Sequence, residues 1–153
     1  MEWAERQEWS NGKVGLLEIS YYAGSQWRVA ARRPKGLAAI TPWEGTSDYY
    51  RDLCRQGGIL LNIFIDFWWV KVGENQHGKP NKGGECTLTE EELGKNRRDQ
   101  TQDNRTYRFR DQEYYASKEY DLGDVQVPLL SVGNWGGITL HLRGNIEDYK
   151  RAF

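Results

Sequence analysis

The stretch KVGLLEISYYAGSQW, residues 13–27, decides the fold of this chain of 153 residues. Its first part, Val14–Ile19, is a short apolar run of the kind found in strands buried on both faces of a parallel sheet. The run stops at Ser20, and residues 21–33 carry apolar side chains on one side of a helix that a proline ends. A second buried strand follows at residues 37–41. Strand, helix and strand within about thirty residues predict a βαβ unit with a right-handed crossover.

Two further elements are predicted directly after this unit. Residues 47–56 suit a helix, which the pair Gly57-Gly58 would end. Residues 59–72 are apolar and aromatic. Their length favours a helix, while their β-branched and aromatic content leaves a strand open.

The second half of the chain is richer in charge. Thr89 and Glu92 have the spacing of a capping box, which predicts a helix start. The rest of the charged residues 89–120 are most simply a solvated, mobile face. A third buried strand is expected at residues 127–132, and a final amphipathic helix at residues 138–153.

Composition excludes several classes of function. The chain has 21 basic and 22 acidic side chains, and a net charge of −1 supplies no positive field for nucleic acid or an anionic membrane. Cys54 and Cys86 lack the CxxC spacing of zinc and redox motifs, so we expect no cofactor and no metal. The first residues lack the apolar core of a signal peptide, and the longest apolar run falls short of the roughly 20 residues of a membrane span. The expectation is a cytoplasmic protein.

Ser20 has two interpretations that the stretch itself leaves open. A serine between a strand and a helix matches a nucleophile elbow, in which a strained turn lifts the hydroxyl above the sheet edge. The backbone N–H of Tyr21 would then help to hold the oxyanion. Glu18 and Tyr22 depart from that pattern, because the positions two before and two after the serine are usually small. The alternative is a serine that caps the helix.

Four stretches in the right order carry a resemblance to a known family. They are SYYA with the following pair Gln26-Trp27, WSNGKVG at residues 9–15, LAAITPWEG at residues 37–45, and VPLLSVGNWGG at residues 127–137. Together they resemble the cocaine-esterase-like and X-Pro dipeptidyl-peptidase-like serine hydrolases. The resemblance implies an α/β fold over residues 1–153: a partial α/β-hydrolase core of about three parallel strands with flanking helices. A helical, partly disordered cap insert is expected at residues 46–124.

The resemblance also implies an activity and a site. Ser20 would attack an ester or amide bond, including an X-Pro peptide bond, and form an acyl-serine intermediate. Tyr21 would donate its backbone N–H to the oxyanion, and Tyr22 and Trp43 would line the pocket for a small-molecule ester or peptide substrate. The family's early strands, its catalytic histidine and its jelly-roll domain have no counterpart in the sequence. We therefore expect an internal, truncated segment that is weakly active or inactive alone.

The acid and the base of a catalytic triad are not identified by the sequence. Gly136 and Gly137 stand where the family commonly has an aspartate, and Glu147-Asp148 on the last helix suit a solvent-exposed pair. His141 has the right order in the chain but is expected to be a packed or surface histidine, and His77 comes too early. The general base is expected to come from outside the sequence.

Two residues and one alternative function complete the expectations. Glu44 and Asp48 form a carboxylate cluster that we interpret as hydrogen bonding at the start of the insert. A non-catalytic interaction protein is the alternative to the hydrolase, since an incomplete parallel sheet leaves aromatic faces and unpaired edges exposed. Self-association would then occur through those sheet edges.

Overall fold

A computed structural model describes residues 1–73, 87–137 and 139–152 of the chain. The chain divides into two compact units, one formed by Met1–Asp52 with Lys118–Phe153 and the other by Leu53–Ser117. The expectations for His77 and Cys86 lie outside the described residues. The insert predicted at residues 46–124 contains all residues of the second unit and a few on either side. The role of this insert as a cap stays a prediction.

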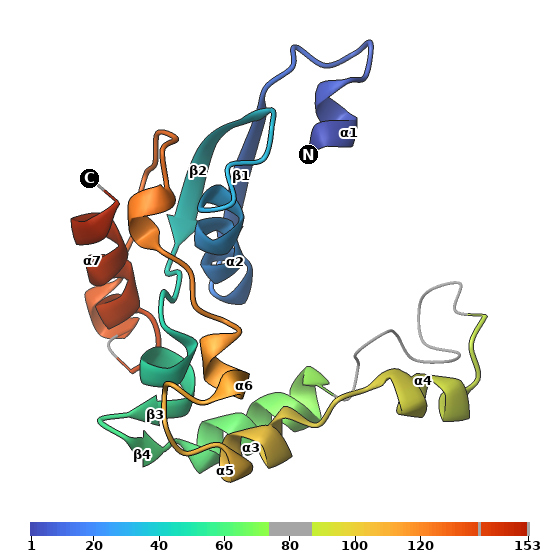
Figure 1. Ribbon diagram of the computed structural model, residues 1–153, viewed down its shortest axis with the longest axis vertical. Coiled ribbons are helices and arrows are strands. Elements are labelled where there is room, and N and C mark those ends of the chain that lie inside the picture. Colours follow the sequence, from blue (N-terminus) through green and yellow to red (C-terminus); the bar gives the residue numbers. More distant parts are fainter. Residues whose placement is uncertain (74–86, 138, 153) are drawn as a thin grey trace. The chain divides into compact units, whose positions relative to one another are not determined.

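The first unit contains the predicted βαβ arrangement (Figure 1). After the short helix α1 (Glu2–Glu5), strand β1 (Val14–Ile19) leads into helix α2 (Tyr21–Ala30) and strand β2 (Leu37–Trp43). β1 and β2 pair in parallel, with Leu16 opposite Ile40. The helix ends three residues before the predicted end, because the chain turns there and Arg33 takes a left-handed φ of 50°.

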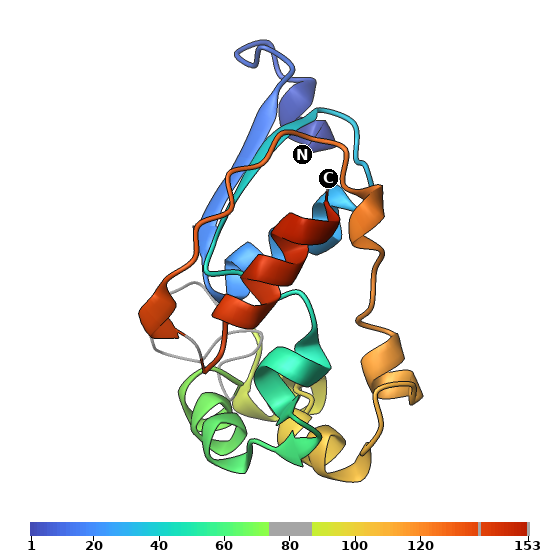
Figure 2. The ribbon, with the colours of Figure 1, turned by 90° about the vertical axis from the view of Figure 1, so that its left-hand side faces the viewer.

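A third parallel segment lies beside β2, as the views in Figures 1 and 2 agree. Ile40 donates its N–H to the carbonyl of Pro128, and the N–H groups of Leu130 and Val132 reach β2 carbonyls at 3.1 Å each. These contacts are isolated bridges and no continuous strand, since Pro42 of β2 lies between the two bridges and has no N–H to donate to the third segment. β2 is therefore the middle of three parallel segments.

The prediction that these strands are buried on both faces is wrong for the two outer segments. Leu17 of β1 is 69% exposed and Leu130 is 62% exposed. Only β2 has a parallel partner on each side among the described residues, and it alone contributes a fully buried residue, Ile40, to the apolar core. A continuous apolar run indicates a parallel strand but does not reveal whether both of its faces are covered.

The core of the first unit forms where α2 packs on the sheet. Trp27 and Ala30 of α2 are buried against Ile40, and Leu122 and Val125 close the cluster from the region of the 3₁₀ helix η3 (Leu122–Asp124). A fully buried aromatic side chain of this size contributes a few kcal/mol to stability, so Trp27 fixes the helix on the sheet.

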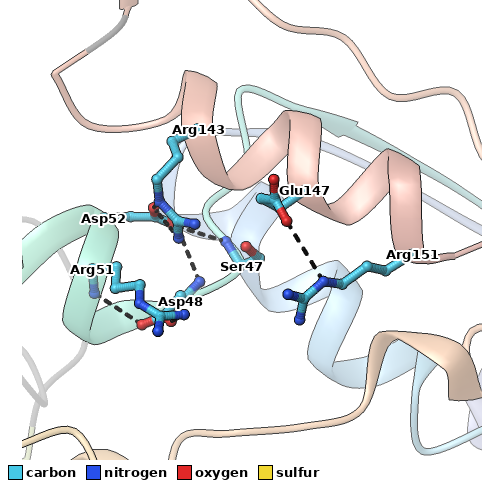
Figure 3. A network of polar contacts seen from close by, with 7 residues as sticks. All are labelled: Ser47, Asp48, Arg51, Asp52, Arg143, Glu147 and Arg151. Carbon is cyan, nitrogen blue, oxygen red and sulfur yellow. Dashed lines mark hydrogen bonds and ion pairs between the residues drawn. The ribbon is translucent and has the colours of Figure 1, made fainter.

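Helix α7 (Leu142–Arg151) is held to the third segment and to the turn after β2. Asn145 is buried, donates to the carbonyl of Val132 at 2.9 Å and accepts from Ser131 at 2.6 Å. Arg143 pairs with Asp52, which lies in the single π-helical turn η1 (Tyr49–Cys54), as Figure 3 shows. Residues 47–56 were predicted as an α-helix, and only this shorter π-helical turn forms, because Asp52 bonds back to the N–H groups of residues 47 and 48.

The second unit begins with a hairpin and continues with short helices. Strands β3 (Arg55–Gln56) and β4 (Ile59–Leu60) pair in antiparallel, and Gly57 and Gly58 have φ values of 61° and 85°. This pair was predicted to end a helix, but left-handed φ at both central positions is the requirement of a type I′ hairpin turn of two residues. Four helices follow in the described residues: α3 (Asn62–Lys71), α4 (Glu90–Asn96), α5 (Gln100–Thr106) and α6 (Glu113–Ala116).

The charged region has a buried side that the sequence reading missed. The predicted capping box is confirmed, since Thr89 and Glu92 exchange both hydrogen bonds at the start of α4. Leu93 is fully buried and Tyr115 is 1% exposed, so residues 89–120 are more than a solvated, mobile face. Arg55 donates to the carbonyl of Asn104 at 2.7 Å, and Tyr115 donates to the side chain of the same asparagine. In the part of the chain that is described, no helix has the length and apolarity needed to cross a membrane.

Candidate active site

Ser20 sits at a sharp turn between β1 and α2. Its backbone has φ 61° and ψ −120°, a strained conformation for a residue with a side chain. Its N–H donates to the carbonyl of Trp43 at 2.9 Å, which ties the turn to the end of β2. Ser20 occupies the N-cap position of α2, yet its side chain makes no capping hydrogen bond to the helix. Its Oγ lies instead 3.0 Å from Nε2 of His141.

The two departures from the elbow pattern are accommodated at the surface. Glu18 and Tyr22 are both exposed, so neither bulky side chain occupies the inside of the turn. The Glu18 carboxylate accepts a hydrogen bond from the N–H of Ile19 at 3.1 Å. Gly24 lies one turn into α2 and packs closely against the loop that follows β2. A Cβ at this position would lie 2.9 Å from Oγ1 of Thr46.

Gln26 holds the elbow against the sheet. Its side chain is 2% exposed, donates to the carbonyls of Glu18 and Thr41, and accepts from the Thr41 N–H at 3.0 Å. One amide thus bridges the two strands on either side of the turn. A buried amide with its polar groups satisfied makes the position of α2 relative to β1 and β2 specific.

His141 is the N-cap residue of α7 and is brought to Ser20 across 121 positions of sequence. Its side chain is 15% exposed. Burial lowers the pKa of His141 below its ordinary value of 6.5, and the nearby Glu44 carboxylate opposes that effect. The imidazole is therefore neutral at pH 7 and can accept a proton at Nε2.

Glu44 is a residue of the site that the sequence reading placed elsewhere. It follows β2 directly, and its Oε2 lies 3.8 Å from Nδ1 of His141. Parallel strands present their carboxyl ends at one edge of a sheet, and Ser20, Glu44 and the loop before His141 each follow such an end. That rule was the available signal, because β1 and β2 were both predicted correctly.

The other residues predicted for the site are three aromatic residues, Tyr21, Tyr22 and Trp43. Tyr21 opens α2 and is 59% exposed, Tyr22 is 63% exposed, and their rings meet edge to face. Trp43 ends β2 and is 48% exposed. These three aromatic residues come from the two segments that also carry Ser20 and Glu44.

The other three carboxylates considered from the sequence are either paired with cations or buried away from Ser20. Asp48 accepts from the backbone N–H of Arg51 and pairs with its side chain (Figure 3). Glu147 pairs with Lys150 and Arg151 along α7, each at 3.6 Å. Asp148, predicted to be solvent-exposed, is fully buried instead, and burial raises its pKa to about 8. It faces inward because α7 turns that side toward the turn after β2.

Solved structures with a similar fold are known. Two crystal structures of a CocE/NonD family hydrolase from Staphylococcus aureus superpose on 99% of this chain with a TM-score of 0.76 and 30% sequence identity. The chain covers 24% of the length of that protein. The fold is therefore that of a partial α/β-hydrolase core.

Sequence comparisons agree with the structural ones. Cocaine esterase from Rhodococcus sp. strain MB1 Bresler is 37% identical over 69 residues, which are 45% of this chain and 12% of the esterase. The chain thus spans a minor part of the relatives it matches. The family model described as X-Pro dipeptidyl-peptidase (S15 family) matches residues 1–152. This chain belongs to the X-Pro dipeptidyl-peptidase family S15, together with esterase-like hydrolases of the CocE type.

Proposed function

We propose that this chain carries the nucleophile of a serine hydrolase that cleaves ester or amide bonds, including X-Pro peptide bonds, through an acyl-serine intermediate. The observation that supports it best is the 3.0 Å contact between Ser20 Oγ and His141 Nε2 at a strained strand-to-helix turn. A serine hydroxyl is a weak nucleophile unless a base within hydrogen-bond reach takes its proton.

The first chemical step follows from that contact. Ser20 Oγ attacks the substrate carbonyl carbon while its proton passes to Nε2 of the neutral His141. The carbonyl π electrons move to oxygen and form the oxyanion. His141 then returns the proton to the departing alcohol or amine, and the C–O or C–N bond breaks to leave the acyl-serine. Attack by water, with His141 again as base, releases the acid and restores the hydroxyl.

The oxyanion is assigned to the start of α2. Tyr21 follows the nucleophile, and the N–H at this position is the donor that elbow hydrolases use. The N-terminus of a helix also favours negative charge, because the peptide dipoles of α2 align along its axis. Removal of one such donor typically costs roughly 10²–10³ in kcat in serine hydrolases.

The substrate surface is assigned to the aromatic residues around the turn. Tyr22 and Trp43 are partly exposed and come from the two segments that meet at Ser20. Aromatic rings of this kind hold apolar acyl groups or the ring of a proline. Because the chain covers 24% of its solved relatives, we propose that turnover by this chain alone is slow.

The test uses p-nitrophenyl acetate and an X-Pro p-nitroanilide with the full 153-residue chain. We expect a burst of p-nitrophenol that does not exceed the amount of protein, followed by slow turnover. Ser20→Ala should abolish the burst, and His141→Gln should slow it. Ser25→Ala is the matched control, since Ser25 is an exposed serine of α2 whose hydroxyl bonds to the carbonyl of Tyr22. A burst that survives in Ser20→Ala would contradict the proposal.

A second proposal is self-association through the edge of β1. Leu17 and Ile19 are 69% and 52% exposed on a strand that pairs only with β2 in the described residues. An apolar strand with one unpaired edge favours pairing with a second copy. Size-exclusion chromatography with light scattering should show a dimer or larger species that Leu17→Lys shifts toward monomer. A monomer at all concentrations would rule this out.

A further inference from the structure

Glu44 is held in a conformation that residues with side chains seldom adopt. Its φ is 53°, and its backbone N–H donates to the carbonyl of Val132 at 2.7 Å. The next residue, Gly45, is packed so closely that a Cβ there would lie 2.9 Å from the indole nitrogen of Trp27. A left-handed residue other than glycine costs of order 1 kcal/mol or more, and such strain is retained most often at functional positions.

The strained backbone presents the Glu44 carboxylate to one particular nitrogen. Nε2 of His141 faces Ser20 Oγ, so the nitrogen toward Glu44 is Nδ1, at 3.8 Å from Oε2. The two side chains are 15% and 17% exposed, which shields their attraction from solvent. A base that receives a proton at Nε2 becomes positively charged, and a carboxylate beside Nδ1 stabilises that charge and selects the tautomer.

Three other described carboxylates in this unit, those of Asp48, Asp52 and Glu147, are engaged elsewhere. Asp52 pairs with Arg143 and accepts two backbone N–H groups, and Asp48 pairs with Arg51. Glu147 pairs with two cations of its own helix. The loop at Gly136 and Gly137, where the resemblance led us to look for an acid, carries no carboxylate.

We propose that Glu44 is the positioning carboxylate of this site, which holds the His141 ring with Nε2 toward Ser20 and stabilises the imidazolium that forms there. This inference rests on the proposed function. The resemblance placed the acid of the site after the later strand at residues 127–132. The proposal gives that role to Glu44, which follows β2. The 3.8 Å separation becomes that of an ion pair once Nε2 has received the proton, and we expect it to shorten to a hydrogen bond in that state.

The variant Glu44→Gln keeps the size of the side chain and removes its charge. We expect kcat for p-nitrophenyl acetate to fall about 100-fold, with KM changed less than about twofold, because the effect acts on proton transfer. Glu44→Asp should restore part of the rate. Glu147→Gln, which removes a carboxylate of α7 that does not face His141, is the matched control and should leave kcat unchanged.

A titration of the His141 ring by NMR gives a readout that needs no turnover. Glu44 raises the pKa of His141, so Glu44→Gln should move the midpoint to lower pH, while Glu147→Gln leaves it in place. An unchanged midpoint together with an unchanged kcat would overturn the role of Glu44 and leave Ser20 as nucleophile intact. If the wild-type chain forms no acyl-serine, both the proposed function and the role of Glu44 are overturned. The comparison of wild type with Ser20→Ala distinguishes this outcome from the loss of the Glu44 role alone.

Discussion

At the scale of the residue, Ser20 combines backbone strain with a hydrogen-bonding contact to His141. A residue with a side chain at φ 61° and ψ −120° is destabilised by roughly 1–3 kcal/mol relative to a glycine in the same conformation. Ser20→Gly should therefore be more stable than Ser20→Ala by about 1 kcal/mol, while both lack the proposed nucleophile. Chemical denaturation of the two variants measures the difference. Equal stabilities would mean that the turn at position 20 is relaxed.

The protonation state of His141 leads to a second prediction at the scale of the residue. Its pKa lies below 6.5 because the ring is largely buried, so the neutral form persists into mildly acidic solution. The rate of acyl-serine formation should be constant above about pH 7 and fall at lower pH, with a midpoint below 6.5. Stopped-flow measurement of the p-nitrophenol burst across pH gives this midpoint. A midpoint above 7 would show that another group is the base.

At the scale of the element, α7 carries His141 to the site and must dock closely. Gly144 lies one turn into α7, and a Cβ there would come within 2.7 Å of the Ser47 nitrogen and nearer still to the Asp52 carboxylate. Gly144→Ala should destabilise the chain by about 1–3 kcal/mol, since backbone and a buried carboxylate cannot move aside at low cost. It should also slow acyl-serine formation by displacing His141. Ile146→Ala, on the exposed side of α7, serves as the control in thermal unfolding.

The elements themselves differ in how far the sequence revealed them. β1, α2 and β2 followed from local patterns, because each is fixed by short-range periodicity and by the turn at Ser20. The hairpin at Gly57-Gly58 and the buried side of residues 89–120 did not follow, since both depend on tertiary partners such as Asn104. Charge density predicted solvation, but Leu93 and Tyr115 among those charges are buried.

The candidate site was predicted in part for the same reason. Ser20 and Tyr21 follow from the strand-to-helix order within a few residues. The proximity of His141 depends on α7 returning to the sheet edge, which no local pattern encodes. Glu44 follows from topology, because it comes directly after the strand adjacent to the elbow strand. The signal for it existed once two neighbouring parallel strands were predicted.

At the scale of the whole molecule, a buried acid makes stability depend on pH. Asp148 is 0% exposed, and burial raises its pKa to about 8, although the Ser47 side chain beside it acts in the opposite direction. Its ordinary value is 3.8, so between these values the folded chain keeps a proton that the unfolded chain releases. The Asp148 contribution to stability is therefore lost as pH rises through this window.

Asp148→Asn removes this dependence while it keeps the shape of the side chain. The variant should gain in melting temperature relative to wild type, with a larger gain near pH 8 than near pH 5. Each tenfold change in proton affinity corresponds to about 1.4 kcal/mol. A gain independent of pH would show that Asp148 is ionised in the folded state.

The most direct measurement is covalent labelling by a fluorophosphonate, followed by mass spectrometry of the proteolytic peptides. Our account predicts one adduct per chain on the peptide that contains Ser20, slower formation in His141→Gln, and none in Ser20→Ala. An intact, folded chain that takes up no label, or that carries the label on another residue, would contradict it.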